Sequence, residues 1–188
     1  MPIIGIQASA ISGNLWPANS YESIATATVG AGGSASIVFS SIPATYKHLQ
    51  IRCIARLSGA SYNSIFRPNG DSSTASYTYH SLYADGTTTT ADAYTTGLSG
   101  AYSLFSTSSA QGANTFGVGV IDVLDYTSTN KYKTFRSFQG WDNNGSGFLF
   151  LSSSLWKDTS VISSLTIVPE AGSFVQYSQF ALYGIKGA

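Results

Sequence analysis

Alternation of apolar and polar side chains with a period of two is the feature that most constrains the fold of this chain. Successive side chains of a β-strand point to opposite faces, so such alternation predicts a strand with one buried face. The clearest instance is the stretch "HLQIRCIAR", in which Leu49, Ile51, Cys53 and Ala55 alternate with Gln50, Arg52, Ile54 and Arg56. We expect Arg52 and Arg56 to lie on the wet face of this strand, together with His48 and Gln50, in contacts at the sheet surface or at a subunit boundary.

Several further segments predict strands, separated by small turn residues. We expect them over Ser23–Val29, Ala35–Phe39, Tyr77–Ala84, Phe116–Leu124, Lys133–Trp141, the run "FLFLSS" that starts at Phe148, Ile162–Val168 and Phe174–Ile185. The glycine-rich "GAGGS" predicts a hairpin between the first two of these strands. Asp85-Gly86 and Asn144-Gly145 are turn dipeptides, and the second predicts the clearest hairpin of the chain. Helical periodicity is absent, so nine or ten short strands predict an all-β antiparallel sandwich or jelly roll.

The chain is long enough for one domain, and we expect residues 21–188 to form a single β-sandwich. Residues 1–20 contain no charged side chain, and Gly5, Gly13 and Pro17 oppose a helix. We expect an extended N-terminal arm that attaches to a neighbouring subunit or an underlying shell; the alternative is an arm that folds back as an edge strand of its own sandwich. Its interface candidates are Ile3, Ile4, Ile6, Leu15 and Trp16.

The segment also lacks the basic start and continuous apolar core of a secretion signal, and no run of about 18 apolar residues predicts a membrane span.

Charge is scarce in this chain, at 10% of residues with a net charge of zero. A nucleic-acid-binding protein normally has a basic excess, so we expect no nucleic-acid partner. Since no apolar run is long enough to span a membrane, we also expect no membrane partner. Lys47, Arg67 and the two arginines of the "HLQIRCIAR" strand could bind phosphate with Tyr46 or Tyr62 stacking on bases, but structural pairing is the favoured interpretation. A surface with few charges and many tyrosines suits protein interfaces.

Residues that could carry chemistry are few. His48 and His80 lie on separate expected strands, and Asp122 and Asp125 are three positions apart, on opposite faces of a strand. We therefore expect no catalytic, metal-binding or cofactor-binding residues, and no enzyme activity. The single cysteine, Cys53, is expected to be a buried core residue rather than a reactive thiol.

Aromatic loop residues can stack on sugar rings. A possible glycan contact is therefore assigned to Trp141, Asp142 and Asn143, directly at the expected hairpin turn.

Several blocks of the chain resemble a family of small virion proteins of tailed bacteriophages. They are "YESIATATVGAGGSASIVFSSIPATYKHLQIRCIAR", "GANTFG", "IDVLDYTSTNKYKTFRSF", "LWKDTSVISSLTIVP" and "FVQYSQFALYGIKG", and they extend from Tyr21 to Ala188. The resemblance implies a non-enzymatic β-sandwich on the surface of a phage particle, made in the host cytoplasm. It transfers no catalytic residue.

These observations lead to the expectation of a structural protein on the exterior of a bacteriophage virion, with a capsid decoration (cement) protein slightly favoured. A tail fibre or baseplate component, and a carbohydrate-binding receptor-recognition module, remain the alternatives. The expected partners are other virion proteins, the major capsid or tail proteins, and further copies of the chain in a homo-oligomer, with a trimer suiting both head and tail.

Overall fold

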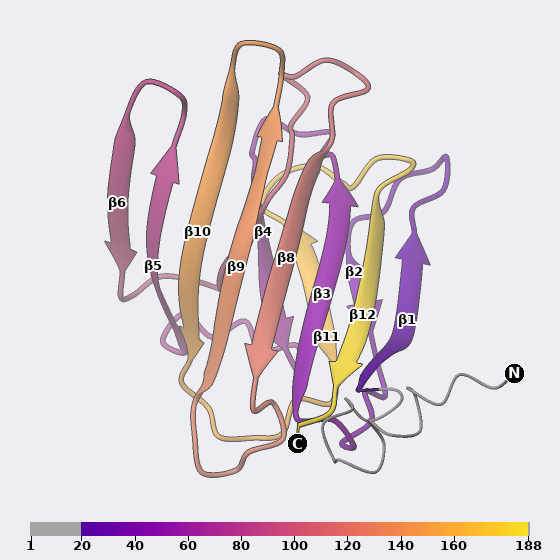
Figure 1. Ribbon diagram of the computed structural model, residues 1–188, viewed down its shortest axis with the longest axis vertical. Coiled ribbons are helices and arrows are strands. Elements are labelled where there is room, and N and C mark those ends of the chain that lie inside the picture. Colours follow the sequence, from indigo (N-terminus) through magenta and orange to yellow (C-terminus); the bar gives the residue numbers. More distant parts are fainter. Residues whose placement is uncertain (1–19, 188) are drawn as a thin grey trace, which may run out of the picture.

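The computed structural model describes residues 20–187, apart from the side chains of residues 103–105. Twelve strands form two antiparallel sheets, and no helix is present among these residues. The sheets pack face to face as a β-sandwich, with the smaller sheet behind the larger one in Figure 1. The all-β sandwich prediction is thus confirmed. The strands divide eight and four between the sheets, so the jelly-roll form of that prediction is not confirmed. The N-terminal arm lies outside the described residues.

The larger sheet has the strand order β1-β12-β3-β8-β9-β10-β5-β6. In this spatial order its strands are β1 (Tyr21–Thr28), β12 (Gln179–Ile185), β3 (His48–Ala55), β8 (Gly117–Leu124), β9 (Lys133–Asp142), β10 (Gly147–Trp156), β5 (Tyr77–Ala84) and β6 (Thr89–Tyr94). The smaller sheet has the order β2-β11-β4-β7, with β2 (Ile37–Phe39), β11 (Leu165–Pro169), β4 (Asn63–Pro68) and β7 (Ala101–Phe105).

The predicted hairpin between Ser23–Val29 and Ala35–Phe39 is wrong. Both segments are strands, but β1 pairs with β12 in the larger sheet and β2 pairs with β11 in the smaller one. The glycine-rich segment between them instead carries the chain from one sheet to the other. Gly33 has a φ of 71°, and a Cβ at this position would lie 3.0 Å from the carbonyl oxygen of Phe174. Gly33 therefore serves a close backbone crossing rather than a two-strand turn.

The other two turn predictions are confirmed. β5 and β6 form a hairpin, in which the side chain of Asp85 accepts hydrogen bonds from the backbone N–H groups of Thr87 and Thr88. β9 and β10 form the second hairpin, with Asn144 and Gly145 both at positive φ, as expected when Asn-Gly stands at the centre of a tight turn.

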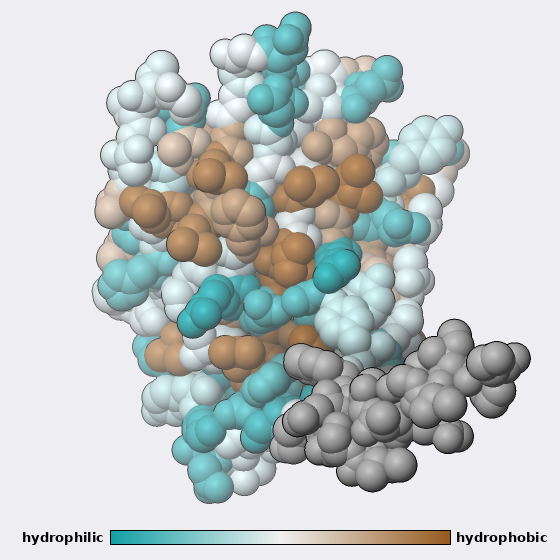
Figure 2. All heavy atoms as spheres, in the orientation of Figure 1, coloured by the Kyte–Doolittle hydropathy of each residue, from teal (hydrophilic) through white to brown (hydrophobic). Residues whose placement is uncertain are grey.

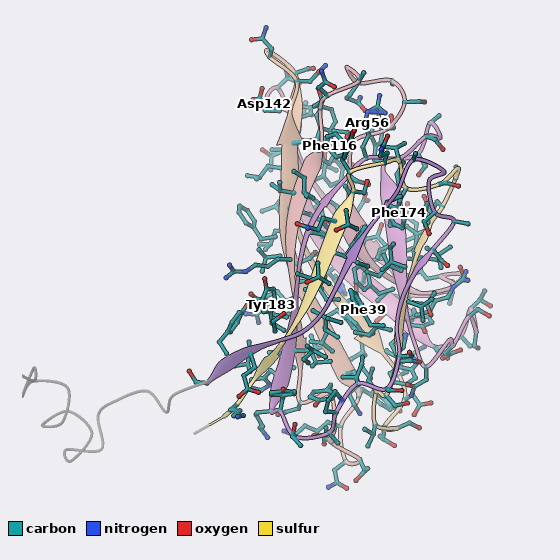
Figure 3. All side chains as sticks on the ribbon, turned by 90° about the vertical axis from the view of Figure 1, so that its right-hand side faces the viewer. Phe39, Arg56, Phe116, Asp142, Phe174 and Tyr183 are labelled. Atoms are coloured by element: carbon teal, nitrogen blue, oxygen red, sulfur yellow. The ribbon has the colours of Figure 1, made fainter. Side chains whose placement is uncertain are left out.

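The core lies between the two sheets. The larger sheet contributes Leu49, Ile51, Ile121, Val123, Phe135, Phe180 and Leu182, and the smaller sheet contributes Ile37, Phe39, Phe66, Leu165 and Ile167. Phe66 and Phe135 meet across the sheets with their ring centroids 6.5 Å apart. Figure 3 shows the sandwich edge-on, with Phe39 between the sheets and Tyr183 on the outer side of the larger one.

The alternation that defines β3 is confirmed, because Leu49, Ile51, Cys53 and Ala55 are buried while the side chains between them face outward. Cys53 is a buried core residue, as predicted, and burial raises the pKa of its thiol to about 12.

The inner face of the β9–β10 hairpin is partly polar. The Ser137 and Ser152 hydroxyls lie 2.6 Å apart, and Ser154 donates a hydrogen bond to the carbonyl oxygen of Tyr102 on β7. Because these side chains are small, β7 can approach this part of the larger sheet closely. The larger apolar residues Leu149 and Leu151 of β10 lie on the opposite, outer face.

Candidate interaction surface

Exposed apolar side chains gather on the outer face of the larger sheet. Each is between 36% and 57% exposed, and together they form what we call the apolar band: Ile54, Leu82, Val118, Val120, Phe138, Leu149 and Leu151. They come from five neighbouring strands, β3, β8, β9, β10 and β5. Figure 2 views this face and shows hydrophobic side chains gathered across the middle and upper part of the sheet.

The pairing of the strands arranges the band in two rows that cross the sheet. The first row runs through Ile54, Val118, Gly140, Leu149 and Ala84, and the second through Arg52, Val120, Phe138, Leu151 and Leu82. Residues paired across antiparallel strands stand side by side, so the apolar side chains of a row are neighbours on the face, and Gly140 interrupts the first row between Val118 and Leu149.

A shallow depression of about 1000 Å³ lies at the first row. Gly140 contributes no side chain there, and the depression is bordered by Val118, Phe138 and Leu149 and by the turns at Gly86 and Gly145. A Cβ at Gly140 would lie 2.5 Å from the carbonyl oxygen of Phe148. The glycine is therefore required by the close approach of the β10 backbone, and the hollow in the face is its consequence.

A polar third row borders the band. It runs through Gln50, Asp122, Arg136, Ser153 and His80. Gln50 Nε2 donates to Asp122 Oδ1 at 2.8 Å, and Arg52 Nε donates to Gln50 Oε1 at 3.1 Å. These hydrogen bonds pair Gln50 and Asp122 within the sheet surface, and the row forms a polar boundary of the band.

A cation–π stack lies on the outer face where β3 is followed by β12 and β1. The Arg52 guanidinium lies 5.6 Å from the ring centroid of Tyr21 and 5.9 Å from that of Tyr183, and the two rings stack on each other. The arrangement holds Arg52 against the two rings on the outer face of the larger sheet.

The structure separates Arg56 from Arg52. β3 ends at Ala55, and the half-buried Arg56 side chain donates from Nη2 to the carbonyl oxygen of Gln111 at 2.9 Å and from Nη1 to that of Leu57 at 3.4 Å. Figure 3 shows Arg56 beside the loops at one end of the sandwich. Its contacts fix the loop that precedes β8, whereas Arg52 alone faces the band.

Trp141 lies at the inner side of the β9–β10 hairpin, between Tyr62 and Phe148, with ring centroids 6.0 and 6.4 Å away. Asp142 Oδ1 accepts from the backbone N–H of Asn144, and Asn143 Oδ1 accepts from the Thr115 hydroxyl. The side chains of Asp142 and Asn143 therefore help to hold the turn, whereas the buried indole N–H of Trp141 has no hydrogen-bond partner among the described residues. Trp141 and Asp142 border the depression.

The two histidines lie on β3 and β5, with three strands between them, and His48 contacts Asp125. His48 Nδ1 accepts a hydrogen bond from the backbone N–H of Asp125, and His80 stands on the polar third row. Ion pairs with Lys131 and Lys47, at 2.7 and 2.9 Å, hold the pKa of Asp125 well below its usual range. Within residues 20–187, no three His, Cys, Asp or Glu side chains are grouped so as to hold a metal ion.

The five interface candidates of the N-terminal arm, Ile3, Ile4, Ile6, Leu15 and Trp16, lie outside the described residues. Within the described part of the chain, no helix is long and apolar enough to cross a membrane.

None of the site residues predicted from the sequence belongs to the apolar band. The runs "FLFL" of β10 and "GVGVI" of β8 could have indicated it, because they have no polar side chain at either odd or even positions of the strand. Such runs indicate a strand whose two faces are both apolar.

The fold and this surface define an antiparallel β-sandwich with an apolar outer face. Comparison of the chain with protein-family models, with curated proteins and with solved structures found no match.

Proposed function

We propose that this protein is a non-enzymatic structural component of the exterior of a bacteriophage particle, and that it assembles there through the apolar band. The apolar band is the observation that carries the proposal. Outer faces of sandwich sheets are ordinarily polar, because alternate residues of each strand face water. Contiguous exposed apolar surface instead marks a site of interaction with another molecule.

The energetics favour covering this surface. Burying the exposed half of one leucine, valine or phenylalanine side chain of the band would make the free energy of association more favourable by about 1 kcal/mol. The border adds specificity rather than affinity, since Gln50, Asp122 and Arg52 are already bonded to one another. A partner therefore needs apolar side chains and no charge over the band.

Within the virion, a capsid decoration (cement) protein is the favoured role, with the major capsid protein and further copies of the chain as partners. Support comes from the resemblance of the Tyr21–Ala188 blocks to small virion proteins and from the compact two-sheet form of the described residues. A tail fibre or baseplate component is the alternative, with tail proteins as partners.

The test compares two leucines on the same outer face. Leu149→Lys places a charge in the band, whereas Leu124→Lys places one at an exposed position beyond the polar third row. We expect Leu149→Lys to fail to bind particles that lack the protein, while Leu124→Lys binds as the parent does. A density map of decorated particles then assigns head or tail. Unchanged binding by Leu149→Lys would exclude the band as the assembly surface.

Carbohydrate binding is the second candidate, favoured by the depression that Asp142 borders on the outer face. A glycan array probed with the isolated protein separates the two. Saturable binding of one glycan class that Asp142→Ala abolishes would support receptor recognition, and a signal no higher than that of a denatured control would exclude it.

A further inference from the structure

We propose that the apolar band is the docking site for the N-terminal segment, residues 1–19, of a second copy of this chain, with Ile3, Ile4 and Ile6 as the residues that contact it. The inference rests on the proposed function, because it names the partner that covers the same surface.

The shape of the band favours one extended segment over a broad interface. Neighbouring strands lie about 4.8 Å apart, so a band crossing five strands is about 20 Å long and, with two rows, about 10 Å wide. Six or seven extended residues at about 3.3 Å each have this length. A stable interface between globular surfaces covers about 800 Å² on each partner, several times the area of the band.

The chemistry of the segment matches the surface. Residues 1–20 carry no charged side chain, and the "PIIGI" stretch places three isoleucines within four positions. The first row of the band is wholly apolar, and the hollow at Gly140 can receive a branched aliphatic side chain. No charge needs to be desolvated without a partner on either side.

The place where the described chain begins favours a second copy over the chain's own segment. Ser20 accepts a hydrogen bond from the backbone N–H of Lys186 at the start of edge strand β1. The neighbouring Tyr21 pairs with Ile185, at the opposite end of the sheet from the first row. A segment returning over its own face would cross the stacked Tyr21, Arg52 and Tyr183 and the polar third row, covering groups that it cannot pair. A segment from a neighbour reaches the band without crossing them.

The length of the segment allows this exchange. Nineteen extended residues span at most about 63 Å, so about 40 Å of reach remain after six or seven residues lie on the band. A contact of this kind is heterologous, since a tail of one copy meets the face of the next, and such contacts close into rings when the rotation permits.

Cysteine pairing between two different chains tests the proposal directly. A size-tagged Ile4→Cys chain is mixed with a Leu149→Cys chain and oxidised mildly, and the products are separated without reduction. The native Cys53 is buried, with its pKa raised to about 12, so it remains a poor competitor. We expect a disulfide-linked product containing one chain of each kind.

The matched control replaces Leu149→Cys with Ser153→Cys, on the same strand and face but in the polar third row. Equal yields from the two pairings would overturn the proposal. A chain carrying both Ile4→Cys and Leu149→Cys that forms only an internal disulfide would also overturn it, because the segment would then cover its own face.

A charge test separates this inference from the proposed function. Ile4→Asp with Ile6→Asp should weaken self-association in sedimentation by at least about tenfold, while Ser9→Asp with Ser12→Asp, which adds the same charge at polar positions, should not. If Leu149→Lys abolishes particle binding but the isoleucine variant changes neither particle binding nor self-association, the proposed function stands and the segment is not the occupant. If neither variant has an effect, both proposals fail.

Discussion

At the scale of single residues, Lys133 is the side chain that most departs from its usual place. It is fully buried, and its ammonium donates to the carbonyl oxygens of Ser128, Lys131 and Thr159 at 2.6 to 3.1 Å. Burial lowers the pKa of the ammonium, while Asp158 and Asp125 oppose that effect. The lysine thus ties the β8–β9 connection to the segment after β10.

Replacing Lys133→Met should lower the free energy of unfolding by about 2–4 kcal/mol, because three carbonyl groups lose their donor in a buried site. Denaturant unfolding measures this loss. The control is Lys131→Met, whose ammonium is largely exposed beside Asp125 and should contribute less than about 1 kcal/mol. Similar losses in the two variants would mean that the carbonyl cage adds nothing to stability.

At the scale of elements, the β9–β10 hairpin combines features that are usually separate. Ser152 and Ser154 face inward, whereas Leu149 and Leu151 face outward. The inward serines bond to Ser137 and to the Tyr102 carbonyl, so the polar side is satisfied within the fold. In this hairpin the buried residues are therefore those that face the smaller sheet, whether they are polar or apolar.

The close backbone approach at Gly140 gives a prediction for this element. Gly140→Ala should lower stability by about 1–3 kcal/mol, because the added Cβ would lie 2.5 Å from the Phe148 carbonyl oxygen. Gly32→Ala is the control, since a Cβ there meets nothing within 4 Å. Thermal unfolding compares them, and a Gly140→Ala variant as stable as the parent would show that β10 shifts at little cost.

Two of the strands that the sequence does not predict carry no one-sided apolar pattern. β4, β6 and β7 were missed: the "TTADAY" of β6 has no apolar face, and the consecutive Ser64, Ile65 and Phe66 of β4 are all buried. Alternation carries no signal in either case.

At the scale of the whole molecule, buried and partly buried tyrosines should make the fold sensitive to alkali. Burial is the main cause that raises the pKa of Tyr77, Tyr79 and Tyr102. Cys53 is raised in the same way, to about 12. These groups keep their protons in the folded state at a pH where the unfolded chain has lost them.

The free energy of unfolding should therefore be unaffected by these groups below about pH 8 and fall as the pH rises through about 9 to 10 and beyond. Lys133, with its lowered pKa, acts in the opposite direction but is a single group. Denaturant unfolding at a series of alkaline pH values measures the slope. Tyr79→Phe should make it shallower, and a stability that rises above pH 10 would contradict the assignment.

The fold class and the location of two hairpins follow from the sequence alone. Period-two alternation and the turn dipeptides Asp85-Gly86 and Asn144-Gly145 are local signals, and they act between residues a few positions apart.

The tertiary structure alone decided which strands are neighbours, and hence the apolar band. β1 pairs with β12 rather than with β2, and Ile54, Val118 and Leu149 share a row although they are far apart in the chain. Pairing between distant strands depends on how two whole sheets pack, and only that pairing joins separate outward-facing residues into one surface.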